Sequence, residues 1–180
     1  MRFNKLQTLA LCIDVQERLF PHIDQFEALE KNIQLVIKGL NVLGVPIALS
    51  EQYKKGLGET LPTIKSLIDP IFQFEKTAFS CADDSTFEYE LTKEAKEQII
   101  LFGIEAHICV LQTAIDLKSQ GLEPIVVVDC IGSRTSLNKE IALERLKQEG
   151  VFLTTYEAIL FELCKKAGNE QFKEISKLVK

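Results

Sequence analysis

The sequence predicts an α/β fold in which helices cover both faces of a parallel β-sheet. Short apolar runs, typical of buried strands, alternate along the chain with longer segments of helical periodicity. Because the loops are short, each helix connects one strand to the next. A strand that follows such a helical crossover runs parallel to the strand before it. The chain has 180 residues, 46% of them apolar. That length suits one buried core, and we expect a single domain over residues 1–180.

The first half of the chain supplies three strands and one long helix. The run from Thr8 to Asp14 is apolar and ends in a charge, as a buried parallel strand does. Apolar residues at helical spacing predict a helix over 26–43, closed by Gly44 as its C-cap. Two more apolar runs, 45–50 and 71–75, are the second and third strands.

The second half continues the alternation. We expect a helix over 84–95, a strand over 98–103 and a helix over 106–120 that stops at Gly121. The run 124–129 is the clearest strand of the chain. The remaining elements are expected to be a helix over 138–148 capped by Asn138, a strand over 151–154, a helix over 156–164 and an exposed amphipathic tail helix.

Charge and hydropathy exclude several partners. The chain has 26 acidic and 21 basic residues and a net charge of −5, so it offers no basic excess for nucleic acid. No apolar run approaches the roughly 20 residues of a membrane helix, and no membrane partner is expected. The N-terminus is polar and lacks the apolar core of a signal peptide. We therefore expect a cytoplasmic protein that acts on a small molecule.

Cysteine and histidine usage narrows the chemistry further. The five cysteines are odd in number, and none has CxxC spacing, which argues against a disulfide framework or a zinc finger. Only two histidines occur, and no cluster has metal-ligand spacing, so we expect no metal and no other cofactor. The GxGxxG, GxxxxGK[ST] and GxSxG motifs are absent. Their absence argues against an NAD- or nucleotide-binding domain, which is one rival hypothesis.

Ligands of such folds bind at the carboxyl ends of the strands, where Asp14 and Lys76 both stand. A carboxylate in a cleft can act as a general base; alternatively Asp14 caps a turn or pairs with a cation. Lys76 follows the third strand among apolar and small residues. Its ammonium could lower the pKa of a neighbouring thiol, although a surface lysine is the commoner case.

Cys109 lies where the fourth strand passes into a helix. Free backbone N–H groups and the helix dipole there favour a thiolate, which would lower the thiol pKa, and could hold an oxyanion. The alternative is a buried structural cysteine. His107 is a rival base, but residues two apart on a helix do not face each other, and we expect it to line the pocket or bond a backbone carbonyl. Cys81 is a rival nucleophile without a clear strand-to-helix switch.

The chain resembles isochorismatase-like cysteine hydrolases over about residues 8–165. The resemblance rests on segments that occur in the same order and at similar spacing: Leu11–Gln16, Phe74–Ser80, Gly103–Ala114, Val127–Arg134 and Thr154–Leu163. It implies a three-layer α/β/α fold whose central six-stranded parallel sheet has the order 3-2-1-4-5-6. In that order the first and fourth strands are neighbours, and the third lies about 10 Å from the first.

The resemblance also implies a mechanism. Cys109 is then the nucleophile, Asp14 the general base and Lys76 the cation that supports the thiolate. A cis peptide between Ile104 and Glu105 is expected, with the backbone N–H groups of Glu105 and Cys109 forming an oxyanion hole. Relatives of this kind commonly form homo-oligomers, and we expect at least a dimer.

Two departures from the family pattern shape the expected activity. Nicotinamidases of this superfamily bind zinc through histidines after the second strand, but residues 50–56 contain none, so we expect a metal-independent enzyme. Members that cleave isochorismate lack the cysteine, whereas its presence favours cleavage of an amide-type C–N bond through an acyl-enzyme. By position, the expected substrate-contacting residues are Gln16, Phe20, Tyr53, Phe79 and His107. The rival from another class is a catalytically idle domain that serves as an interaction module.

Overall fold

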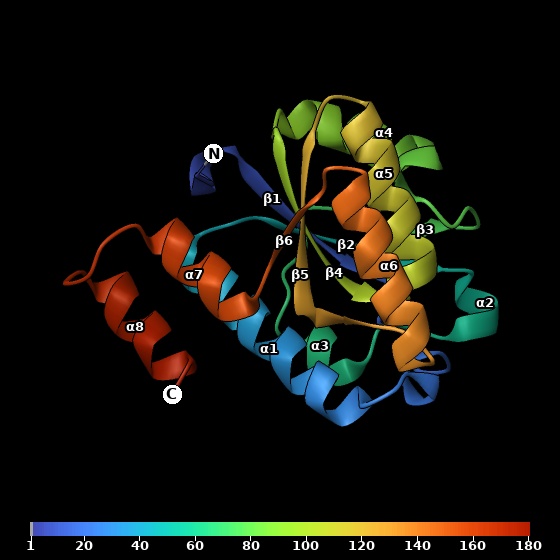
Figure 1. Ribbon diagram of the computed structural model, residues 1–180, viewed down its shortest axis with the longest axis horizontal. Coiled ribbons are helices and arrows are strands. Elements are labelled where there is room, and N and C mark those ends of the chain that lie inside the picture. Colours follow the sequence, from blue (N-terminus) through green and yellow to red (C-terminus); the bar gives the residue numbers. More distant parts are fainter. Residues whose placement is uncertain (1) are drawn as a thin grey trace.

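Six parallel strands form one sheet in the computed structural model, which describes residues 2–180 (Figure 1). The strand order is β3-β2-β1-β4-β5-β6, and every neighbouring pair is parallel. The strands are β1 (Thr8–Ile13), β2 (Ile47–Gln52), β3 (Gln73–Lys76), β4 (Gln98–Ile104), β5 (Glu123–Gly132) and β6 (Phe152–Thr154). The expected fold class and strand order are confirmed.

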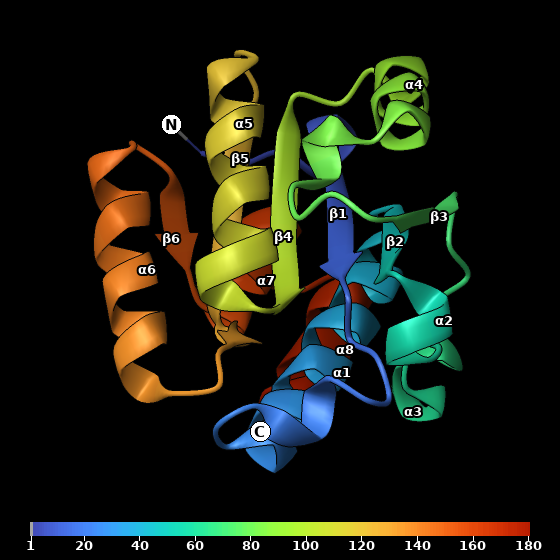
Figure 2. The ribbon, with the colours of Figure 1, turned by 90° about the vertical axis from the view of Figure 1, so that its right-hand side faces the viewer.

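Helices lie on both sides of the sheet (Figures 1 and 2). They are α1 (Phe26–Leu43), α2 (Lys54–Leu57), α3 (Pro62–Lys65), α4 (Ser85–Glu94), α5 (Leu111–Ser119), α6 (Ser136–Gln148), α7 (Tyr156–Cys164) and α8 (Glu170–Leu178). Short 3₁₀ turns span Lys5–Gln7, Phe20–His22 and Cys81–Asp83, and a π-helical turn spans Ala106–Val110.

Alternation along β1 divides the core between the two faces of the sheet. Ala10 and Cys12 join the apolar cluster beneath α1, α7 and α8. Leu9, Leu11 and Ile13 join the cluster beneath α4, α5 and α6. Every residue of β1 is buried, because a strand in the middle of a parallel sheet has a layer of helices on each side.

The register between β1 and β4 fixes the spacing of the two strand ends that carry Asp14 and Cys109. Gly103 of β4 lies opposite Ile13 of β1. A Cβ atom on Gly103 would come within 2.1 Å of the Ile13 carbonyl oxygen, and its φ is +119°. Only glycine tolerates both the close approach and this backbone conformation.

Several boundaries differ from the sequence predictions for local reasons. The predicted helix over 106–120 begins as the π-helical turn, and α5 proper starts at Leu111. Helix α6 starts at Ser136, because Thr135 rather than Asn138 is its N-cap and accepts a hydrogen bond from the Asn138 N–H (3.3 Å). Gly44 does close α1, with φ +70°.

The tail helix is docked rather than fully exposed. Ile175 of α8 is completely buried in the cluster that α1 and α7 share, and Gln171 donates to the Val42 carbonyl oxygen of α1. Within residues 2–180, no helix combines the length and apolar character needed to span a bilayer.

Candidate active site

Three side chains from separate strand ends meet at the carboxyl edge of the sheet. Asp14 follows β1, Lys76 ends β3, and Cys109 lies in the turn after β4. Lys76 crosses the width of β2, and its Nζ reaches Asp14 Oδ2 at 2.7 Å; both side chains are fully buried. The strand order is the reason for the convergence, since β1 lies between the strands that lead to the other two residues.

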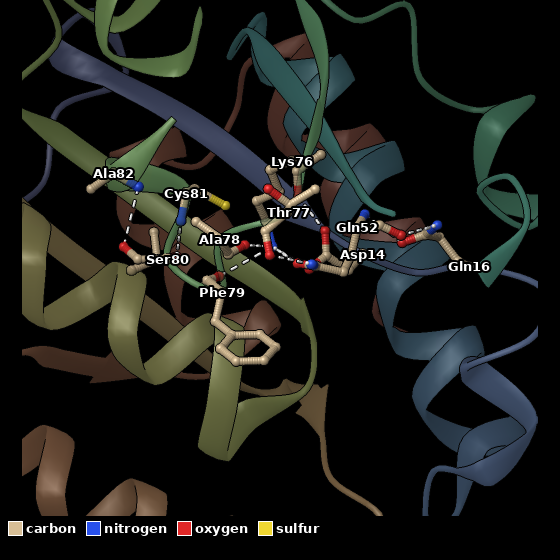
Figure 3. A network of polar contacts seen from close by, with 12 residues as sticks. Asp14, Gln16, Gln52, Lys76, Thr77, Ala78, Phe79, Ser80, Cys81 and Ala82 are labelled. Atoms are coloured by element: carbon tan, nitrogen blue, oxygen red, sulfur yellow. Dashed lines mark hydrogen bonds and ion pairs between the residues drawn. The ribbon is translucent and has the colours of Figure 1, made fainter. Parts of the chain in front are cut away.

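Every N–H group of the Lys76 ammonium has an acceptor within the chain. Besides Asp14 the ammonium donates to Gln52 Oε1 (2.6 Å), the Ala78 carbonyl oxygen (3.2 Å) and the Phe79 carbonyl oxygen (3.1 Å) (Figure 3). Burial alone would lower the Lys76 pKa, but the charge of Asp14, with smaller contributions from Cys81 and Cys109, raises it above its usual value. The lysine is therefore charged at neutral pH and fixes the turn after β3.

The Asp14 carboxylate is held from two sides. Oδ2 accepts from Lys76, and Oδ1 accepts from the Ser50 hydroxyl at 2.7 Å. The Asp14 backbone has φ +52°, and its N–H donates to the Ser50 carbonyl oxygen (3.2 Å). These contacts fix the orientation of a fully buried carboxyl group.

Cys109 has a raised thiol pKa, so the predicted lowering is wrong. The residue is only 5% exposed. Burial is the main cause of the shift and the charge of Asp14 the next, while Lys76 acts in the opposite direction. A helix start and one ammonium do not outweigh the loss of hydration next to a carboxylate. The thiol is therefore neutral at neutral pH and stands beside a fixed carboxylate that can accept its proton.

The turn that carries Cys109 is tied to the loop after β5. The peptide bond between Ile104 and Glu105 is cis, as the resemblance implied. The Glu105 side chain is 4% exposed, and Arg134 binds both of its carboxylate oxygens at 2.9 to 3.2 Å. His107 Nδ1 lies 2.9 Å from the hydroxyl oxygen of Ser133, so His107 contacts a side chain rather than a backbone carbonyl.

Two of the five predicted substrate-contacting residues do other work. The Gln16 side chain is fully buried: its Nε2 donates to the Gln52 and Gly58 carbonyl oxygens, and its Oε1 accepts from the Gln52 N–H. It therefore joins the loops after β1 and β2, and both of its N–H groups are used within the chain. Phe20 is 2% exposed, belongs to the apolar cluster beneath α1, and packs edge-to-face on the partly exposed Phe26.

The other three predicted contacts stay near the surface. Tyr53 and Phe79 are 51% and 55% exposed, and His107 is half-buried. Tyr53 donates its N–H to the Lys76 carbonyl oxygen, and the Phe79 carbonyl oxygen accepts from the Lys76 ammonium. The two aromatic residues thus extend from backbone segments that Lys76 fixes.

The Cys81 thiol lies near enough to the Lys76–Asp14 ion pair for both charges to shift its pKa. The Cys81 N–H donates to the Thr113 hydroxyl of α5 (2.9 Å). Burial raises the pKa of the fully buried Cys81 thiol to about 12; Asp14 also raises it, and Lys76 lowers it. Cys12 and Cys130 are buried in the core.

Sequence reasoning missed Ser50, Gln52, Ser133, Thr113 and Arg134. One signal was present for the first two. Ser50, Glu51 and Gln52 are a polar run inside a strand that is otherwise apolar, and buried polar side chains need partners. Nothing local marks the remaining three, because their partners come from distant segments.

Two cavities of about 410 and 480 Å³ open elsewhere on the chain, and Asp14, Lys76 and Cys109 line neither. In the part of the chain that the structure describes, no three His, Cys, Asp or Glu side chains cluster as metal ligands would.

The fold and the strand-end residues place the chain among three-layer α/β proteins with the isochorismatase-like hydrolase fold. The Isochorismatase domain model matches residues 8–158. The chain therefore belongs to the isochorismatase family.

Comparisons with known proteins agree with this assignment. Isochorismatase domain-containing protein 2 of Danio rerio is 38% identical over 176 residues, which cover 98% of this chain and 88% of that protein. A Caenorhabditis elegans structure described as MAR1 ribonuclease is 36% identical with a TM-score of 0.92, over 99% of this chain and 92% of that one. The Escherichia coli YcaC gene product, described as an octameric hydrolase of unknown specificity, shares the fold at 21% identity, with a TM-score of 0.93 over 99% and 89% of the two chains.

Proposed function

We propose that this protein is a metal-independent cysteine hydrolase that cleaves an amide-type C–N bond of a small molecule through an acyl-enzyme. The observation that carries the proposal is the 2.7 Å ion pair of two fully buried side chains, Lys76 and Asp14, next to the Cys109 thiol. A buried ion pair is costly to assemble, and hydrophobic residues could replace it in a core. Its presence beside a thiol is typical of a catalytic site.

In the first step Cys109 attacks the carbonyl carbon of the substrate as it loses its proton. Because the thiol pKa is raised, the proton passes to Asp14 during the attack rather than before it. The new S–C bond pushes the carbonyl electron pair onto oxygen. When this tetrahedral intermediate collapses, the C–N bond breaks, and Asp14 returns the proton to the departing nitrogen. The products of this step are an amine and a thioester of Cys109.

In the second step water replaces the amine. Asp14 takes a proton from water, the oxygen attacks the thioester carbon, and the S–C bond breaks. The proton returns to sulfur and the carboxylic acid leaves, which restores the resting site. Lys76 stays charged throughout and keeps Asp14 aligned, because its ammonium is itself held by Gln52 and by two carbonyl oxygens.

We assign the oxyanion hole to the backbone N–H groups of Glu105 and Cys109. Both belong to the turn that follows β4, and this turn is anchored through the Glu105 carboxylate and the His107 ring. Donors that are fixed before the reaction stabilise a developing negative charge without a cost of reorganisation.

The surroundings of the thiol favour a small substrate. Cys109 is only 5% exposed. We assign the exposed aromatic rings of Tyr53 and Phe79, on segments whose backbone Lys76 binds, to the entrance above it. A compact amide, carbamoyl compound or ureide fits such an entrance better than a polymer. Net charge −5 likewise speaks against RNA as a substrate, although a relative is described as a ribonuclease.

The enclosure of Cys109 also gives weight to a second candidate, a catalytically idle domain that serves as an interaction module. In that case the ion pair is structural, and the thiol is one more buried cysteine. Turnover of any substrate with the dependence described next would exclude it.

The test is a screen of small amides, carbamoyl compounds, ureides and a short RNA, with Cys109→Ala as the matched control. We expect release of ammonia or an amine from at least one small compound, no release by Cys109→Ala, and a thioester adduct on Cys109 by mass spectrometry. EDTA should leave the rate unchanged. RNA cleavage by wild type that persists in Cys109→Ala would contradict the proposal.

We further propose a homo-oligomer. Leu137 and Ile141 of α6 are 63% and 55% exposed, and residues four apart lie on one face of a helix. An apolar face of this kind is typical of an interface. Light scattering should give at least twice the 20.3 kDa of one chain. The double variant Leu137→Lys, Ile141→Lys should have the mass of a single chain.

A further inference from the structure

Arg134 binds the turn that carries Cys109 through three hydrogen bonds to the Glu105 carboxylate. Its Nε lies 3.2 and 3.1 Å from the two carboxylate oxygens of Glu105, and its Nη2 lies 2.9 Å from Oε1. The Glu105 side chain is 4% exposed, whereas that of Arg134 is 59% exposed. A guanidinium that reaches in from the surface therefore satisfies a buried carboxylate with fixed, two-pronged geometry.

The same loop holds the turn at a second point. Ser133, the neighbour of Arg134, lies 2.9 Å from His107 Nδ1. The loop is itself held from the opposite layer, since the Asp24 N–H donates to the Ser133 carbonyl oxygen (3.0 Å). Two adjacent loop residues thus fix two residues of the turn, one on each side of Ala106.

Glu105 is also fixed through its backbone. Its carbonyl oxygen accepts from the N–H groups of Ile108 and Val110 at 3.1 and 3.2 Å. The Glu105 carbonyl is held by the turn itself, and the Glu105 carboxylate is held by Arg134 from the loop after β5. The orientation of the Glu105 backbone N–H therefore depends on both sets of contacts. If the carboxylate is released, the carbonyl contacts alone must hold the turn.

We propose that Arg134 is a positioning residue, which acts through the Glu105 carboxylate to aim the Glu105 backbone N–H at the developing oxyanion. This inference rests on the proposed function and adds a residue outside the group that contacts the substrate. The competing explanation is that Arg134 only neutralises a buried charge and serves stability.

The experiment compares two reactions at the same sulfur. With p-nitrophenyl acetate, an S–C bond forms, the carbonyl oxygen becomes negative, and p-nitrophenolate leaves with its electron pair while Asp14 takes the thiol proton. With iodoacetamide, an S–C bond forms and the C–I bond breaks, so the charge leaves as iodide and the carbonyl oxygen gains none. Only acetylation needs the oxyanion donors. The ratio of the acetylation rate to the alkylation rate at Cys109, measured by peptide mass spectrometry, therefore reports how well the oxyanion donors are aligned.

Three variants separate the two explanations. Arg134→Gln removes the guanidinium but strands the Glu105 carboxylate. Arg134→Gln combined with Glu105→Gln removes both charges, so no charge is left unpaired. Arg145→Gln is the matched control, because Arg145 is 57% exposed on α6 and pairs with the exposed Glu149 (3.6 Å) on the same helix.

We expect the acetylation rate of Cys109 to fall about 10- to 100-fold in both Arg134 variants, somewhat less than the loss of a whole oxyanion donor. Alkylation should stay within about threefold, since the charge of its transition state lies elsewhere. The double variant should unfold at a temperature close to that of wild type and still acetylate slowly. A purely structural role predicts that acetylation recovers together with stability, and that result would overturn the inference.

Failure of the proposed function gives a different result. Cys164 is 6% exposed, close to the 5% of Cys109, and stands far from Asp14 in the sequence and on another helix. If the acetylation-to-alkylation ratio of wild-type Cys109 is no higher than that of Cys164, the oxyanion hole itself is absent. If wild type shows the excess and both Arg134 variants retain it, the hole stands and only the role of Arg134 is refuted.

Discussion

Replacement of Lys76 by methionine tests how the buried ion pair holds the site. Methionine keeps the length and much of the volume of the side chain but donates no hydrogen bond. Asp14 then keeps a buried charge without its 2.7 Å partner, and Gln52 Oε1 and two carbonyl oxygens lose a donor. Removal of one member of a buried pair costs about 3–5 kcal/mol.

The assay is urea unfolding. With an m-value of about 2 kcal/mol/M, a loss of that size lowers the midpoint by roughly 2 M. Lys93→Met is the control, since Lys93 is 62% exposed and pairs with Glu90 at 3.3 Å. That change should cost less than about 0.5 kcal/mol.

The pH dependence has a definite sign. In Lys76→Met the folded state disfavours the charged Asp14, so the folded variant binds a proton more readily than its unfolded chain. The contribution of Asp14 to stability is then most favourable below the unfolded carboxyl value of about 3.9 and is lost as pH rises. The deficit relative to wild type should be smaller at pH 4.5 than at pH 7.5, and Asp14→Asn in the variant should recover part of it. A deficit below about 1 kcal/mol, or one equal at both pH values, would refute this reasoning.

Two further predictions concern the buried thiol and the strand crossing. The Cys81 pKa is about 12 in the fold against 9.0 for the free side chain, so folding loses about 1.4 kcal/mol per pH unit as pH rises through that interval. Cys81→Ala should show a shallower fall of the urea midpoint above pH 9, whereas parallel curves would contradict the shift. Gly103→Ala places a Cβ 2.1 Å from the Ile13 carbonyl oxygen and should cost about 3 kcal/mol or more. Gly121→Ala, at φ +83° with no atom within 4 Å, should cost only about 1 kcal/mol by thermal unfolding, and equal losses would remove the steric argument.

The fold could be predicted largely because strands and helices alternate with clear periodicity. Buried runs such as Thr8–Ile13 have no other place than the middle of a parallel sheet. The strand order could not be obtained from periodicity, since nothing in a strand names its neighbour; it came from the resemblance to a family. The start of α6 was misplaced by two residues because Thr135 and Asn138 are both good N-cap residues.

Within the site, position along the strands identified residues but not their surroundings. The ends of β1 and β3 and the turn after β4 singled out Asp14, Lys76 and Cys109, which the structure brings together. The direction of the Cys109 pKa was wrong because dehydration depends on every atom packed around the sulfur. The structural role of Gln16 was not foreseen because its partners are backbone atoms of other loops, which a sequence pattern does not reveal.

The neutral thiol changes how activation should be understood. A preformed thiolate would react with any electrophile at a rate set by its own pKa. A thiol that hands its proton to Asp14 during attack reacts only while that carboxylate is present and aligned. Lys76 then contributes by fixing the base and by offsetting part of its charge, rather than by holding a thiolate.

The most direct test of this account is the rate of iodoacetamide alkylation of Cys109 relative to Cys164, in wild type and in Asp14→Asn, between pH 6 and 8. The two cysteines have similar exposure, 5% and 6%, so their ratio measures activation by the site. We predict that Cys109 reacts at least about tenfold faster than Cys164 and that the Cys109 rate changes little across this pH range. In Asp14→Asn, Cys109 should react no faster than Cys164. Equal rates for the two cysteines, or an excess at Cys109 that survives in Asp14→Asn, would contradict the account.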